Sequence, residues 1–502
     1  MKTNFVALFV LMMFLSQYNS LSELFKFFRA KKKIVLDEQT AQKVAENYEY
    51  LEKKIKEAGS IYGINTGFGA LCNTVIPETD LTQLQYNLMR SHAAGIGEIV
   101  PLPIVKWMLL VKILHLAKGY SGIQIETLQR LIDFYNHDII PVVYEQGSLG
   151  ASGDLAPLAH LSLPLIGEGE VIYQNQRYSG EQILELFGWK PISLKPKEGL
   201  ALLNGTQLMN AYGLYILMQL EEWWEIILKT AALSCEAFEV LTTPYKAILH
   251  QIRPHTGQML VAKWFEDTLS QSKNLLQPKP QVQDPYSFRC IPQVLGASYD
   301  VIQFVKNTFE IETNSVSDNP TIFSEKDCIL SGGNFHGQPL ALGLDFMAIA
   351  LSEIASISER RCFWLLSGTR GLNPFLAFHP GLESGLMIAQ YTAAAMVSQN
   401  KQLCFPNSVD TIPTSNGQED HVSMGANAAI KCLKVFENLQ KVIAIEFLHA
   451  LRAIQLKKIQ NQMSPVLQKW LSELQIELPT SDFYIHEVIQ HILNRFLVCQ
   501  KN

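Results

Sequence analysis

The spacing of apolar residues divides the chain into two parts with different patterns. Residues 21–206 alternate short amphipathic segments with glycine-containing polar loops, whereas the chain from residue 207 is dominated by long runs that are apolar on more than one face. A helix of that kind must be covered by other helices or by another subunit. The long runs span residues 207–241, 255–270, 292–310, 339–366, 383–400 and 421–458.

This pattern predicts a mainly α protein in three segments. Residues 1–20 form an apolar N-terminal extension, residues 21–206 an N-terminal domain, and residues 207–502 a long helical bundle that continues into an oligomer. Within the N-terminal domain we expect helices over 37–58, from 81, over 104–118 and over 179–187. A short hairpin is predicted over 170–178, turning at Gln174-Asn175.

Composition excludes several functional classes. The 502 residues are 48% hydrophobic and 18% charged, which is typical of a globular protein with a large core. A mixed net charge of -6 gives no footprint for nucleic acid. The eight cysteines are scattered without metal-ligand spacing, which predicts reduced thiols in a cytoplasmic protein without a metal site.

The N-terminal extension carries an apolar run from Phe5 to Leu15, after Lys2. Its length matches the core of a signal peptide, but no small-x-small cleavage site follows it. The run is too short to cross a bilayer, and lysines at 106 and 112 make 104–118 a core helix rather than a membrane span. We therefore expect no membrane partner.

The stretch from Gly147 to His160 carries the most distinctive chemistry, because glycines surround a single Ala151-Ser152-Gly153 triplet. Glycine leaves the amide nitrogen of residue 153 unshielded, so a strained loop can press it against the Ala151 carbonyl. Ring closure with loss of water, including the Ser152 hydroxyl, would leave an exocyclic double bond. That group would be an electrophile made from the backbone.

Of the other known glycine-rich motifs, only a simple helix-entry loop fits the residue spacing of this stretch. A nucleophile elbow needs a residue between the serine and the second glycine. The run has neither the ending of a P-loop nor the spacing of a dinucleotide fingerprint. A glycine-rich helix entry with Ser152 or Asp154 as the N-cap explains the spacing without any chemistry.

Further glycine-containing polar segments lie between the predicted helices. Each has a structural interpretation: Asn204 as a cap, Arg289 as an ion-pair partner, Phe335 as a core residue, Glu419 as a first-turn charge. The segments are Tyr62 to Gly69, Asn204 to Thr206, Gln283 to Arg289, Ser331 to Gln338 and Gln418 to His421.

Taken together, these segments and the Ala151-Ser152-Gly153 loop resemble the histidine, phenylalanine and tyrosine ammonia-lyase family in identity and order, from about residue 21 to the C-terminus. The resemblance implies that Ala151, Ser152 and Gly153 cyclise to methylidene-imidazolone (MIO). It also implies a homotetramer whose active sites are shared between subunits.

The resemblance assigns a role to each candidate residue. Tyr62 is the expected base, and its pKa must be lowered for that role, for example by helix N-termini. Asn204 and Arg289 are expected near the cofactor and the substrate carboxylate, where arginine grips with two parallel hydrogen bonds. Tyr286 and Gln283 would hold and tune the site, and Phe335 would pack beside the substrate ring.

The residues expected at the side-chain pocket resemble those of the histidine-specific members. These members share the Ser91-His92 pair and an acidic residue at the position of Glu419, so His92 and Glu419 are the expected partners of an imidazole ring. Gly337-Gln338 and Asn416-Gly417 depart from the commoner pairs. The implied reaction is elimination of ammonia from L-histidine to give trans-urocanate.

Two alternatives remain open from the sequence. A phenylalanine or tyrosine ammonia-lyase, or a 2,3-aminomutase, would use the same MIO. A non-catalytic protein could keep the fold, although the presence of Ser152, Tyr62 and Arg289 argues against it.

Overall fold

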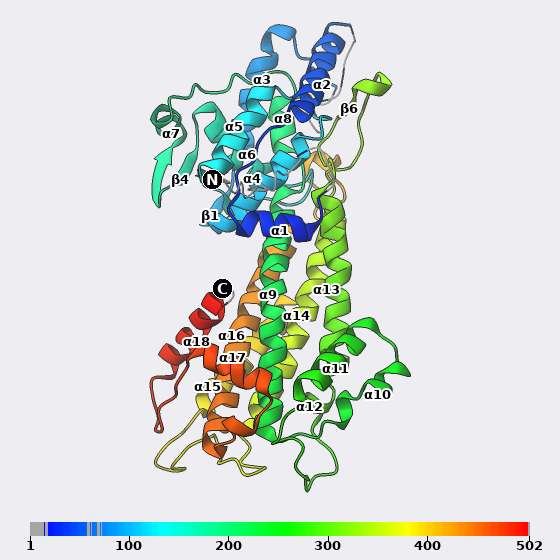
Figure 1. Ribbon diagram of the computed structural model, residues 1–502. Coiled ribbons are helices and arrows are strands. Elements are labelled where there is room, and N and C mark those ends of the chain that lie inside the picture. Colours follow the sequence, from blue (N-terminus) through cyan, green and yellow to red (C-terminus); the bar gives the residue numbers. More distant parts are fainter. Residues whose placement is uncertain are drawn as a thin grey trace, which may run out of the picture. The chain divides into compact units, whose positions relative to one another are not determined.

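The structure is a computed structural model that describes residues 15, 19–57, 61, 63–67, 71 and 73–499 (Figure 1). Most of the predicted N-terminal extension and the predicted base Tyr62 lie outside the described residues. The prediction of a mainly α protein is confirmed. The helices are α1 (Leu21–Arg29), α2 (Glu38–Glu57), α3 (Leu81–His92), α4 (Leu102–Leu116), α5 (Ile125–Asn136), α6 (Leu155–Ser162), α7 (Gly180–Leu186), α8 (Glu198–Leu203), α9 (Gln207–Phe238), α10 (Ala247–Gln251), α11 (Thr256–Leu269), α12 (Tyr286–Arg289), α13 (Ile291–Thr313), α14 (Gln338–Leu365), α15 (Met387–Leu403), α16 (Gly425–Lys457), α17 (Pro465–Leu474) and α18 (Ile485–Cys499).

The described residues also form three small antiparallel sheets. Strand β1 (Ile96–Ile99) pairs with β3 (Tyr144–Gln146), and β4 (Glu170–Tyr173) lies between β2 (Ile140–Pro141) and β5 (Gln176–Ser179). Strand β6 (Thr321–Phe323) pairs with β7 (Cys328–Leu330). Strands β4 and β5 are the predicted hairpin, with Tyr173 opposite Gln176 across the Gln174-Asn175 turn.

The chain forms two compact units, each built from three separate segments. The first unit contains residues 1–215, 306–344 and 406–430, and the second contains 216–305, 345–405 and 431–502. The predicted division after residue 206 differs from this one, because α9, α13, α14 and α16 each contribute residues to both units.

Helix α4 is the centre of the first unit. Twelve of its fifteen residues are buried, and it packs against α5. Pro101 precedes it and Pro103 lies in its first turn, where proline is compatible with a helix. Downstream, Gly119 with φ +70° ends the helical path. The apolar pattern thus predicts the helix to within two residues at either end.

The second unit is built around side chains that join its long helices. Arg361 of α14 contacts Glu446 of α16 through Nε at 2.5 Å and Nη2 at 2.8 Å. Ser234 of α9 donates to the same carboxylate at 2.7 Å, and Ser298 of α13 donates to Ala350 O at 3.1 Å. These contacts connect the four longest helices of the bundle.

Helix α14 is the one helix among the described residues that is long and apolar enough to cross a membrane. In the structure, 72% of its most apolar window is buried. Core helices of that length meet the same compositional test, so the hydropathy of α14 follows from its place in the bundle.

Candidate active site

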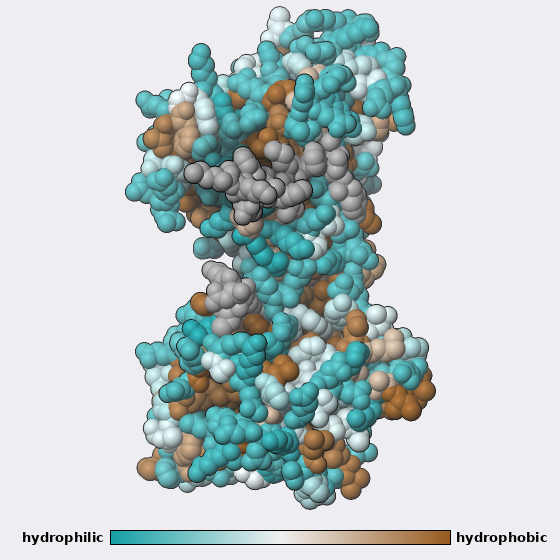
Figure 2. All heavy atoms as spheres, in the orientation of Figure 1, coloured by the Kyte–Doolittle hydropathy of each residue, from teal (hydrophilic) through white to brown (hydrophobic). Residues whose placement is uncertain are grey.

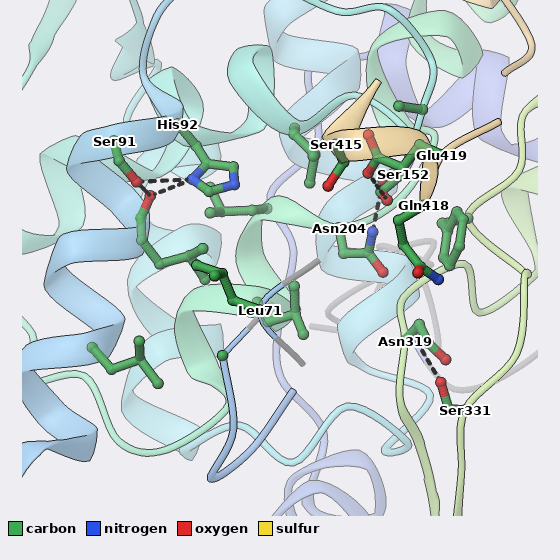
Figure 3. Close-up of a pocket in the computed structure, with 18 of the residues that line it drawn as sticks. Leu71, Ser91, His92, Ser152, Asn204, Asn319, Ser331, Ser415, Gln418 and Glu419 are labelled. Atoms are coloured by element: carbon green, nitrogen blue, oxygen red, sulfur yellow. Dashed lines mark hydrogen bonds between the residues drawn. The ribbon is translucent and has the colours of Figure 1, made fainter. Parts of the chain in front are cut away.

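A cavity of about 810 Å³ lies in the first unit (Figure 3). Its walls come from α3, from the loop around residues 151–155, from the end of α8, from residues 331–336 after β7 and from residues 415–421 before α16. Six predicted site residues line it: His92, Ala151, Ser152, Asn204, Phe335 and Glu419. Segments more than three hundred residues apart in the chain therefore meet at one cavity.

The loop that carries the triplet is held against the entry of α9. Gly153 has φ +78° and pairs with Gly205 in a short parallel bridge, and the next amide, Asp154 N, donates to Gly205 O at 2.7 Å. A Cβ at position 153 would lie 2.1 Å from Gly205 O. Only glycine is therefore compatible with this position, both in φ and in space.

The Asp154 carboxylate connects the triplet loop to the first turn of α9. Its Oδ2 accepts from Leu208 N at 2.9 Å and Met209 N at 3.1 Å, so it caps α9, and its Oδ1 accepts from Ser148 Oγ at 2.8 Å. Burial raises the pKa of this carboxyl to about 6, although the hydrogen bonds oppose the shift. Asp154 is the N-cap residue of α6, as one interpretation of the stretch predicted, but its side chain forms no cap hydrogen bond with that helix.

Ser152 contacts two of the predicted site residues. Its Oγ donates to Glu419 Oε1 at 3.0 Å, and its carbonyl oxygen accepts from Asn204 Nδ2 at 2.6 Å. Thr414 Oγ1 donates to the other oxygen of Glu419 at 2.7 Å, which orients the carboxylate. Asn204 Oδ1 is buried and has no hydrogen-bond partner among the described residues.

His92 approaches the cavity from the last turn of α3, apart from the Ser152–Glu419 pair in Figure 3. Its Nδ1 lies 2.9 Å from Leu88 O, and because a carbonyl only accepts, Nδ1 carries the hydrogen. Burial lowers the pKa of His92, against smaller opposing effects of this hydrogen bond and of Glu419. A neutral ring with its hydrogen on Nδ1 leaves Nε2 as a hydrogen-bond acceptor.

Two further histidines line the same cavity. His336 Nδ1 accepts from Gln338 N at 3.3 Å, so its hydrogen is on Nε2, which lies 3.3 Å from His421 O. The rings stack with centroids 5.4 Å apart. This contact joins the segment that carries Phe335 to the segment that carries Glu419.

Apart from Gly153 of the triplet, three predicted site residues among those described do not line this cavity. Gln283, Tyr286 and Arg289 belong to the second unit. Tyr286 is 71% exposed, and the Arg289 guanidinium lies 4.4 Å from the centre of its ring. Arg289 Nε is buried without a hydrogen-bond partner among the described residues. Their place at the active site stays a prediction from the family resemblance.

Two residues at the site were not identified as functional from the sequence. Asp154 was considered only as a local cap, and Lys112 only as a sign that 104–118 is a core helix. In the structure Lys112 is fully buried and donates to Asn204 O at 3.0 Å. The available indication is a lysine in the middle of an apolar run, because a buried charge needs specific partners.

Comparison with known proteins agrees with the geometry. The chain is 47% identical over 423 residues to the histidine ammonia-lyase of Alkaliphilus oremlandii, covering 84% of this chain and 83% of that one. The structure is similar to the histidine ammonia-lyase of Trypanosoma cruzi, with a TM-score of 0.88, 36% identity and coverage of 96% and 92%. It is also similar to the phenylalanine aminomutase of Pantoea agglomerans, with a TM-score of 0.91, 30% identity and coverage of 95% and 97%.

The sequence model of one family, described as aromatic amino acid lyase, matches residues 20–475. That range contains the triplet loop and every other segment that lines the cavity. The triplet against Gly205, the Asn204 contact and the match over most of the chain lead to one conclusion: this chain belongs to the aromatic amino acid lyase family.

Proposed function

We propose that this chain removes ammonia from L-histidine without oxidation, giving trans-urocanate. The observation that carries the proposal is the cavity itself, which brings Ser152, Asn204 and Glu419 together with a neutral His92. The relatives named as histidine ammonia-lyases support it over an aminomutase, because the identity to the one from Alkaliphilus oremlandii is 47% and that to the aminomutase of Pantoea agglomerans is 30%.

The residues around the triplet fit an MIO group formed from Ala151, Ser152 and Gly153. A bare glycine at 153 leaves its nitrogen open, Asn204 polarises the Ser152 carbonyl, and the unpartnered Asn204 Oδ1 remains available to a ligand. When formed, the group supplies an electrophile that no ordinary side chain offers.

The remaining work falls to side chains of this protein. We assign removal of the proton from the substrate β-carbon to Tyr62, by the family resemblance. Arg289 would hold the substrate carboxylate by a bidentate contact, with Tyr286 and Gln283 beside it. Phe335 would pack against the substrate ring. Glu419 and Thr414 keep the Ser152 side of the cavity polar.

Specificity for an imidazole follows from two acceptors in the cavity wall. His92 Nε2 and the Glu419 carboxylate can both accept from a ring N–H, and an imidazolium ring has one N–H for each. A phenyl ring has no donor for either acceptor. Phenylalanine would leave the acceptors unpaired, and a site built to hydrogen-bond its substrate rejects such an analogue strongly.

The direct test is product analysis with purified protein. L-Histidine should give urocanate, followed by its ultraviolet absorbance, while L-phenylalanine and L-tyrosine should give almost none. A β-amino acid product would indicate an aminomutase, and cinnamate or coumarate as the main product would indicate the aromatic lyases. Either result would replace the proposal.

We expect His92→Leu to lower kcat/KM for histidine by roughly 5- to 150-fold. The estimate corresponds to about 1 to 3 kcal/mol for leaving a polar group unpaired. The ratio of kcat/KM for phenylalanine to that for histidine should rise, because leucine presents no unpaired acceptor to a phenyl ring. Steady-state kinetics with both substrates measure this ratio.

The control is Ser91→Ala, which removes the neighbouring hydroxyl that lies 3.1 Å from His92 Nδ1 but keeps the imidazole. It should change the ratio much less. If His92→Leu lowered stability and left the ratio unchanged, His92 would be a packing residue only.

We also propose a homotetramer whose sites draw Gln283, Tyr286 and Arg289 from a neighbouring subunit. The exposure of Tyr286 supports the proposal, and so does the assignment of these residues to the second unit, whereas the cavity lies in the first. So do large exposed apolar side chains, including Ile248 and Ile252 of the α10 region, where Figure 2 shows a brown cluster. Such surfaces mark contacts with other chains.

Mixing two inactive variants tests the shared site. Ser152→Ala and Arg289→Met chains, co-expressed with different tags and purified as mixed oligomers, should recover activity. Random mixing makes about a quarter of the sites complete when the two residues come from different subunits. Each variant expressed alone is the control. If both residues of a site came from one chain, no complete site would form and no activity would return.

A further inference from the structure

Lys112 is a buried cation to which the proposed reaction gives no role. It lies in the middle of α4 with none of its surface exposed. Its Nζ donates to Ala201 O at 2.8 Å and to Asn204 O at 3.0 Å. These carbonyls belong to the end of α8 and to the residue that follows it, where a cation also meets the negative end of the helix.

Asp318, the carboxylate with the larger effect on Lys112, already has partners of its own. Asp318 contacts Lys197 Nζ at 2.5 Å and His115 Nε2 at 3.3 Å. Burial lowers the pKa of Lys112 to about 7, opposed in part by Asp318. A lysine at this position is therefore costly, and an apolar side chain of similar volume would pack in the same helix without that cost.

The segment that accepts hydrogen bonds from Lys112 also contacts the triplet loop. Asn204 Nδ2 donates to Ser152 O at 2.6 Å, and Gly205 O accepts from Asp154 N at 2.7 Å. The Asn204-Gly205 segment is therefore in contact with Lys112 and also with the triplet loop. A shift of this segment would move Asn204 and Gly205 away from Ser152 and Gly153 together.

We propose that Lys112 is a positioning residue for ring closure of the triplet, acting by holding Asn204-Gly205 against residues 152–154. The proposal rests on the proposed function. In the closure the Gly153 nitrogen bonds to the Ala151 carbonyl carbon. That carbonyl oxygen leaves as water with the amide hydrogens of Gly153 and Ser152, and the Ser152 hydroxyl leaves as a second water with the Ser152 Cα hydrogen. Lys112 exchanges no atom in either step.

The test is the intact mass of folded Lys112→Met protein, followed with time after purification. Wild-type protein should lack two waters from the start. The variant should lose them about tenfold more slowly, as expected when a buried charge-assisted hydrogen bond is removed. Molecules that have lost both waters should show a KM for histidine close to that of the wild type, because Lys112 does not touch the substrate.

Lys197→Met is the matched control, since Lys197 is also a fully buried lysine of the first unit. Its Nζ donates to Ser121 O and Asp318, and no bond from this Nζ to Ala201 or Asn204 is found among the described residues. The main-chain oxygen of Lys197 accepts from Ala201 N at 2.9 Å, and the substitution keeps that bond. We expect it to lower the melting temperature without slowing the loss of water. Should Lys112→Met fail to fold, Lys112→Gln, which keeps an N–H donor, takes its place and should show a smaller delay.

The outcomes separate the two proposals. Wild-type protein with no water missing would refute the cofactor and with it the proposed function. Wild-type protein lacking two waters, together with a folded Lys112 variant that loses them equally fast, would overturn only the role of Lys112. An equal delay in Lys197→Met would also overturn it, because general loosening of the core would then explain the effect.

Discussion

Ser152→Ala should give a folded oligomer with almost no lyase activity. Alanine has no hydroxyl to lose, so the exocyclic double bond cannot form, while the loop keeps its contacts through the backbone of residues 152–154. The hydrogen bond to Glu419 is lost, but it is only partly buried, so its effect on stability should be about 1 kcal/mol. We expect kcat to fall by several orders of magnitude, since the chemistry depends on the electrophile.

Intact mass provides an independent measurement of the same change. Wild-type protein should be lighter than its sequence by two waters, whereas the Ser152→Ala protein cannot lose the water that contains the serine hydroxyl. Ser162→Ala is a suitable control, because Ser162 is a buried serine in α6 whose Oγ has no hydrogen-bond partner among the described residues. The control should lack two waters and stay active. A Ser152→Ala protein with wild-type turnover would refute the cofactor.

Tyr62→Phe should lower kcat by orders of magnitude with a smaller change in KM. The hydroxyl is assigned to proton abstraction, which it performs in the transition state rather than in ground-state binding. Steady-state kinetics with histidine separate the two parameters. The prediction depends on the family resemblance of the Tyr62 to Gly69 segment, because Tyr62 lies outside the described residues.

Intact mass again distinguishes the causes. Tyr62→Phe protein should lack two waters like the wild type, since the phenol takes no part in ring closure. A variant with low kcat and a full-length mass would have lost the cofactor rather than the base. Turnover close to wild type would show that the base lies elsewhere, with Tyr286 and Glu419 as the next candidates.

Local patterns in the sequence determined the fold class and most helix positions. Helix α4, predicted over 104–118, is observed over Leu102–Leu116, and the hairpin turns where Gln174-Asn175 predicts. The presence of apolar residues on all faces of a helix and the positions of proline and glycine are local properties of the sequence. They can therefore be recognised within one segment. Where tertiary contacts bend the backbone, the prediction shifts: α16 begins at Gly425, not at 421, because Met424 has φ +53°.

The sequence does not predict most of the short strands, because their formation depends on contacts with distant parts of the chain. Strands β1, β2, β3, β6 and β7 contain two to four residues each, too few to show an alternating pattern. Strands β1 and β3 exist because Ile96 lies opposite Gln146, a partner fifty residues away. Pairing of that kind depends on how the intervening helices pack.

For the site, the sequence alone determined which residues have suitable chemistry, and the family resemblance determined their expected roles. Only the tertiary structure decided which of them meet. Ser152 and Glu419 are 267 residues apart in the sequence, yet Ser152 Oγ lies 3.0 Å from Glu419 Oε1. Tyr286 and Arg289, in contrast, belong to the second unit. The spacing of residues along a chain indicates on which face of a helix or strand a side chain lies, but it does not indicate which distant residue that side chain contacts. That partner is set by packing, which is why Asp154 and Lys112 gained their contacts with the α9 and α8 termini only in three dimensions.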